Sequence, residues 1–65
     1  MKFEWHMSGI RESDGRHFIA DIIPVYPPMR IVKVYIGEPD DGCLVRVGLR
    51  SSAEEARILA EGWAS

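Results

Sequence analysis

The fold is decided by residues 3–22, which read FEWHMSGIRESDGRHFIADI. Apolar and polar side chains alternate on both sides of Asp14-Gly15, and a period of two residues is typical of a half-buried β-strand. The Asp-Gly pair favours a tight type I′ turn, because glycine accepts a positive φ and aspartate tolerates one. With these two residues as the turn, Met7 lies opposite Ile22. The side chains that then share one face of the hairpin are Phe3, Trp5, Met7, Phe18, Ala20 and Ile22.

The same alternation continues along the chain and predicts four strands in all. Their ranges are Lys2–Glu12, His17–Pro24, Arg30–Gly37 and Cys43–Arg50. Pro27 and Pro28 cannot donate to a strand ladder, so the second and third strands are expected to be joined there. Residues 38–41 are expected to form an acidic loop between the third and fourth strands. That loop places Ile36 opposite Cys43, Val34 opposite Val45 and Val32 opposite Val47, with all six side chains on the buried face.

A short helix is predicted to close the chain. Ser52-Ala53-Glu54-Glu55 is a capping box, in which the serine oxygen accepts a hydrogen bond from the amide of Glu55. The helix is expected over Ala53–Glu61, with Gly62 as the left-handed residue that ends it. One sector of this helix carries its apolar stripe, which consists of Ala53, Ala56, Leu59, Ala60 and Trp63.

Together these elements predict an α+β fold, a four-stranded antiparallel β-meander with one C-terminal α-helix packed on one face (ββββα). Residues 1–65 are expected to form a single domain, because the chain is shorter than the roughly 70–80 residues at which a lone core becomes comfortable. The large residues of the predicted core are Phe3, Trp5, Met7, Phe18, Ile22, Val32, Val34, Ile36, Val45, Val47, Leu49, Leu59 and Trp63.

The composition excludes several classes of protein. A hydrophobic fraction of 46% with a net charge of only −2 argues against intrinsic disorder. No apolar run approaches the roughly 20 residues that a membrane-spanning helix needs, so no membrane partner is expected. The single cysteine, Cys43, cannot form an internal disulfide, and the N-terminal residues do not read as a signal peptide. A cytoplasmic location is therefore expected.

The face of the sheet opposite the helix is the candidate binding surface. A solvated face of an antiparallel sheet is normally polar, yet this one is predicted to carry six apolar residues from four strands. The residues proposed to bind a partner are Ile10, Ile19, Ile23, Ile31, Lys33, Tyr35, Arg46 and Arg50, while Leu44 is the sixth apolar residue of this face. The isoleucines and Tyr35 would supply apolar contact, and Lys33, Arg46 and Arg50 would set orientation at the rim.

Two kinds of partner follow from this surface. The first is another protein or a second copy of the chain, bound by a small non-enzymatic interaction module. The second is a nucleic acid, for which the net charge of −2 is unfavourable because phosphate contacts need a basic footprint. An ordinary alternative is that β-branched residues favour strands and are scattered singly over the surface.

No residue pattern points to chemistry. His6, His17 and Cys43 match no metal-ligand spacing, and no cofactor or metal is expected. Residues 38–42 lack the alternating ligands of a calcium loop. Ser51 and Ser52 are best used as helix caps, and no histidine is placed by sequence to activate them. The chain is therefore expected not to be an enzyme.

Two resemblances extend this interpretation. The strand Cys43–Leu49 followed by Ser52-Ala53-Glu54-Glu55-Ala56 resembles the sheet-plus-helix DNA-binding domains of plant AP2 factors and phage integrase arms, which implies a sheet that enters the DNA major groove. The strand arginine and tryptophan pattern of AP2 domains is missing. The meander with one Ser-x-x-Glu-Ala helix also resembles small uncharacterised bacterial and prophage proteins, and HicB-type antitoxins begin their helix similarly. This second resemblance implies an interaction role.

Overall fold

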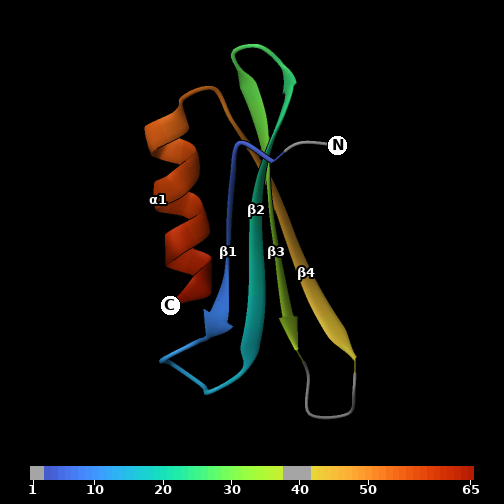
Figure 1. Cartoon of the computed structure of the whole chain (residues 1–65), viewed down its shortest axis with the longest axis vertical. Helices are drawn as coiled ribbons and strands as arrows, with labels where there is room; N and C mark the ends of the chain where they lie inside the picture. Colours follow the sequence, from blue (N-terminus) through green and yellow to red (C-terminus); the bar gives the residue numbers. More distant parts are fainter. Residues whose placement is uncertain (1–2, 38–41) are drawn as a thin grey trace.

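The computed structural model describes residues 3–37 and 42–65, which form four β-strands followed by one α-helix. The elements are β1 (Trp5–Ile10), β2 (His17–Tyr26), β3 (Met29–Gly37), β4 (Cys43–Arg50) and α1 (Ala53–Ala64). The strands form one antiparallel sheet in the order β1-β2-β3-β4, and α1 packs against β2, β3 and β4 on one face (Figure 1). The predicted α+β meander with one C-terminal helix is confirmed. The expected acidic loop at residues 38–41 lies outside the described residues.

The β1–β2 hairpin differs from its predicted register by two residues. Trp5, and not Met7, lies opposite Ile22, because four loop residues separate Arg11 from Arg16 where two were predicted. The Arg11 amide donates to the Arg16 carbonyl oxygen over 2.8 Å, and Gly15 takes the positive φ of 71° that closes this longer loop. A shift of two residues preserves the side on which every side chain lies, so the predicted faces of β1 and β2 are correct.

The β3–β4 register differs by one residue, and this difference reverses the faces of β4. Val34 lies opposite Arg46 and Val32 opposite Gly48, where Val45 and Val47 were predicted. Residues opposite each other in a ladder point to the same side, so a shift of one residue turns every side chain of β4 over. The residues wrongly placed on the buried face are Cys43, Val45, Val47 and Leu49, and those wrongly placed on the opposite face are Leu44, Arg46, Gly48 and Arg50.

The helix begins as predicted and ends later than predicted. Ser52 is the N-cap, and its Oγ accepts a hydrogen bond from the Glu55 amide over 3.1 Å. The helix continues through Gly62 to Ala64, so Gly62 is an interior residue and does not end the helix. The carbonyl oxygen of Ser65 accepts from the Ser13 amide, which fastens the end of the helix to the β1–β2 loop.

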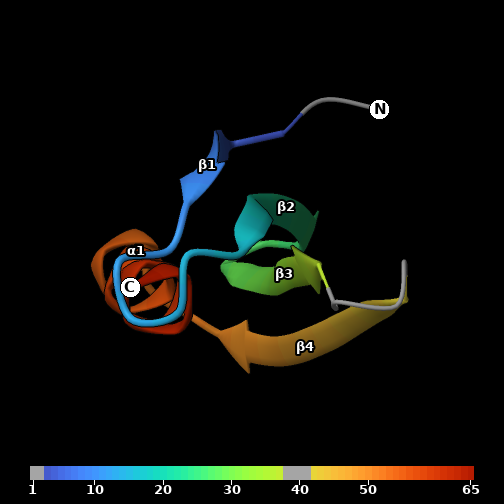
Figure 2. The ribbon, with the colours of Figure 1, turned by 90° about the horizontal axis from the view of Figure 1, so that it is seen from below.

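The core lies between α1 and the two central strands. Figure 2 shows the helix against one side of the sheet. Ala56, Ala60 and Ala64 let the helix approach the sheet closely, and Leu59 and Trp63 pack at the border of this core as half-buried side chains. The strand residues buried beneath the helix are Phe18, Ala20, Ile22, Val32, Val34 and Ile36. Phe3 is 49% exposed and is not part of the core, contrary to its prediction.

Within the part of the chain that the structure describes, no helix is both long enough and apolar enough to span a membrane.

Replacement of the N-cap, Ser52→Ala, should lower the free energy of unfolding by about 1 kcal/mol, because the Glu55 amide loses its side-chain acceptor. Urea denaturation followed by circular dichroism measures this loss. Ser51→Ala is the matched control, since the Ser51 hydroxyl does not accept from the first turn. An equal loss for both variants would show that the cap contributes nothing specific.

Candidate functional site: the outer face of the sheet

The side of the sheet away from α1, here called the outer face, is unusually apolar. Its exposed apolar residues on β2 and β4 are Ile19 at 45%, Val45 at 46%, Val47 at 58% and Leu49 at 53%. The cross-strand register makes these residues neighbours of three half-buried ones, which are Ile23, Ile31 and Tyr35. Tyr35 lies between Ile19 and Val45, and Ile31 lies between Ile23 and Leu49. The outer apolar surface, as the name is used below, comprises Ile19, Ile23, Ile31, Tyr35, Val45, Val47 and Leu49.

The structure separates the predicted site residues into three groups. Five lie on the outer face as predicted, namely Ile19, Ile23, Ile31, Lys33 and Tyr35. Ile10 also belongs to this face by register, but it lies at the end of β1 opposite His17 and outside the outer apolar surface. Arg46 and Arg50 were predicted on the outer face and are on the helix side, opposite Val34 and Arg30.

Sequence reasoning missed the three residues of the site that lie on β4. Val45, Val47 and Leu49 form an apolar row that was taken for a core row, because both alternatives for β4 contain apolar side chains. The available signal was on the other row of the strand. That row consists of Leu44, Arg46, Gly48 and Arg50, and its glycine is the small residue that leaves room for α1. A Cβ at Gly48 would lie 2.9 Å from Leu59 Cδ2 and 3.2 Å from a Trp63 ring carbon.

A row of polar side chains crosses the outer face between its apolar residues. His6 lies opposite Asp21, and Asp21 lies opposite Lys33. Asp21 is only 7% exposed, and one of its carboxylate oxygens lies 2.5 Å from His6 Nδ1. The His6 ring stacks on Phe3 with 5.5 Å between the ring centroids. A buried carboxylate is costly without a partner, so this contact stabilises a polar group inside an apolar surface.

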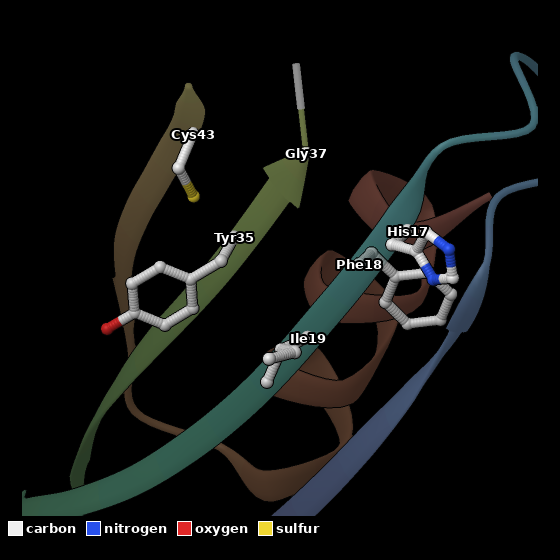
Figure 3. Close-up of a pocket in the computed structure, with 6 residues that line it drawn as sticks. All are labelled: His17, Phe18, Ile19, Tyr35, Gly37 and Cys43. Atoms are coloured by element: carbon white, nitrogen blue, oxygen red, sulfur yellow. The ribbon is translucent and has the colours of Figure 1, made fainter. Parts of the chain in front are cut away.

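One end of the outer face is hollowed into a shallow depression of about 210 Å³. Figure 3 shows the side chains that line it along β2, β3 and the start of β4. The lining residues are His17, Phe18, Ile19, Tyr35, Gly37 and Cys43. The depression is open and almost wholly apolar, so it suits one apolar side chain of a partner better than a polar small molecule.

The free edge of β4 borders the outer apolar surface. β4 is the last strand of the sheet, and no other described strand pairs with its far side (Figure 1). Every residue of β4 except the half-buried Gly48 is exposed. The backbone N–H and C=O groups along a free edge are available to another strand.

The remaining polar groups offer little chemistry. In residues 3–37 and 42–65, no three His, Cys, Asp or Glu side chains lie close enough to hold a metal ion. Cys43 is an exposed free thiol. The Arg30 guanidinium donates to both carboxylate oxygens of Glu4, at 2.9 and 2.8 Å, and to the Pro28 and Ser51 carbonyl oxygens. Arg30 thus ties the segment before β1 to the end of β4.

Comparison with known proteins gives no relative: no family model matches the chain, and no curated protein or solved structure matches it.

Proposed function

We propose that this chain is a small non-enzymatic protein-interaction module that binds a second copy of itself through the outer apolar surface. The observation that carries the proposal is the position of the exposed apolar side chains of β4. Val45, Val47 and Leu49 project from one edge strand and continue a row of apolar residues on the two neighbouring strands. An apolar surface of this extent with polar residues among it is typical of an interface between proteins.

A second copy is the partner that the surface itself favours. Asp21 is nearly buried and bound to His6, so Lys33 is the main exposed charge among these apolar residues, and an apolar surface of this kind can pack against an identical one under a two-fold axis. The chain is also small and has a thin core, and small domains of this kind commonly gain stability by association. The reducing cytoplasm, where Cys43 remains a thiol, is the proposed site of this association.

The register of β4 weakens the case for a nucleic-acid partner. Arg46 and Arg50 lie on the helix side of the sheet, and among the described residues Lys33 is the one lysine or arginine that the register places on the outer face. Direct contact with DNA through a sheet relies on several such cations on one face. Protein association is therefore the better supported function.

Sedimentation velocity of wild type and Val47→Lys at tens to hundreds of micromolar tests this proposal. Val47 is 58% exposed, so a lysine there leaves the core intact but places a charge in the interface. We expect wild type to sediment as a dimer and the variant to dissociate with a Kd at least about tenfold higher, which corresponds to about 1.4 kcal/mol.

Ile58→Lys is the matched control, because Ile58 is 61% exposed on α1, away from the outer face. This variant should remain dimeric. A wild-type chain that is monomeric throughout the range would refute self-association. Equal weakening by both lysine variants would place the interface elsewhere. Binding to duplex DNA that falls steeply with salt would favour the nucleic-acid partner instead.

A further inference from the structure

The edge of β4 is the longer of the two free edges of the sheet. β4 has eight residues, contains no proline, and pairs with β3 without a bulge, and its charged side chains are those of Arg46 and Arg50 on the helix side. Natural edge strands are usually kept from pairing with other chains by short length, proline, a bulge or charged side chains, and the two arginines are the feature of this kind that β4 has. β1 is shorter at six residues, and Arg57 of the helix lies over its Trp5 ring at 5.6 Å.

We infer that β4 pairs edge to edge with β4 of a second copy, antiparallel and centred on Val47. This inference rests on the self-association proposed above and confines the contact to the β4 border of the outer apolar surface, so that residues of β2 such as Ile19 lie outside the pair. An antiparallel pair of identical strands related by a two-fold axis requires that axis to be perpendicular to the sheet. Both helices then lie on one side of a continuous eight-stranded sheet, and the two outer apolar surfaces join on the other side.

Charge selects the register among the symmetric alternatives. Two registers match seven residues of β4 with seven of its copy, one centred on Arg46 and one centred on Val47, in which residues 44–50 lie opposite 50–44. The first places Arg46 opposite Arg46 of the second copy, and like charges directly opposite are destabilising. The second places Arg46 opposite Gly48, Val45 opposite Leu49 and Val47 opposite Val47. Aliphatic side chains thus meet on the outer face, and each arginine faces an uncharged residue.

The helix side of this pair offers Arg46 a partner of suitable chemistry. Trp63 lies directly over Gly48, because a Cβ on that glycine would come within 3.2 Å of its ring. Arg46 placed opposite Gly48 of the second copy therefore comes beside the Trp63 indole of that copy. A guanidinium near an indole face is attracted by the ring quadrupole, and Trp is the best aromatic partner for it. The same contact forms twice under the two-fold axis.

Single cysteines in a Cys43→Ser background test the register by oxidation and non-reducing electrophoresis. Val47→Cys places two thiols directly opposite, where Cα atoms are about 4.5–5.5 Å apart and a disulfide can form. Val45→Cys is the matched control, because residue 45 lies opposite residue 49 and the two thiols are four residues apart, about 13 Å along the strand. We expect Val47→Cys to move from the monomer to the dimer band and Val45→Cys to remain a monomer.

Sedimentation of Ile19→Lys separates edge pairing from packing of one outer face on another. Ile19 lies on β2, two strands away from the β4 edge, so this variant should remain a dimer if the edges pair and should dissociate if the faces stack. A wild-type dimer that cross-links at Val45→Cys, or at no β4 position, would overturn the edge pairing and leave self-association intact. A monomeric wild type would overturn both.

Discussion

Replacement of Ile22 by alanine is expected to lower the free energy of unfolding by about 2–5 kcal/mol. Ile22 is fully buried between Trp5 and Val32 in the sheet. Its truncation removes apolar contacts and leaves a cavity that neighbouring side chains fill only in part. Stabilities of about 0.05–0.15 kcal/mol per residue give this 65-residue domain roughly 3–10 kcal/mol in total. The variant should therefore populate the unfolded state measurably at room temperature.

The matched control for this prediction is Ile19→Ala, which truncates the same residue type on the same strand. Ile19 is 45% exposed on the outer face, so its loss should change the unfolding free energy by less than about 1 kcal/mol. Urea denaturation below the concentration at which the chain dimerises compares the two, with tryptophan fluorescence as the signal. Equal losses for Ile19→Ala and Ile22→Ala would mean that the helix-covered face is not the core.

The faces of β1 and β2 could be predicted from the sequence because an error in turn length did no harm there. Asp14-Gly15 identified the hairpin, and Gly15 has the expected positive φ. The loop is longer by two residues, Glu12 and Ser13, both on the β1 side, which moves the register by two and keeps Trp5 and Met7 on the helix side. A strand has a side-chain period of two, so an even error in register leaves every face unchanged.

The register of β4 could not be predicted in the same way, because both of its faces are partly apolar. The hydrophobic pattern favoured Val45 and Val47 as buried residues, but the helix covers the half-buried Gly48 instead. The decisive quantity is the space that α1 needs, and that space depends on Leu59 and Trp63, which are distant in sequence. Because of this one-residue error, Arg46 and Arg50 were predicted on the outer face, where Val45 and Val47 lie. The predicted site residues on β2 and β3 were placed on the correct face.

Substitution of Gly48 by valine should destabilise the fold by about 1–3 kcal/mol, as is typical of overpacked cores. A Cβ at this position lies 2.9 Å from Leu59 Cδ2 and 3.2 Å from the Trp63 ring, so a valine fits only if these two side chains move from their places in the core. Valine favours strands by up to about 1 kcal/mol over glycine, so the expected net loss of stability is the cost of overpacking minus this gain. Urea denaturation followed by circular dichroism measures it.

A double variant shows whether the helix contact is the cause. Leu59→Ala removes the side chain nearest to the new Cβ, so Gly48→Val should cost less in the Leu59→Ala background than in wild type. Gly62→Ala should instead raise the free energy of unfolding, because a Cβ there meets nothing within 4 Å and alanine is the better helix former by about 1 kcal/mol. A Gly48→Val loss that is the same in both backgrounds would mean that Leu59 does not limit the space over β4. The contact between Gly48 and Leu59 would then no longer explain why Arg46 and Arg50 lie on the helix side. The choice of Val47 as the centre of the proposed β4 pair would lose the same support.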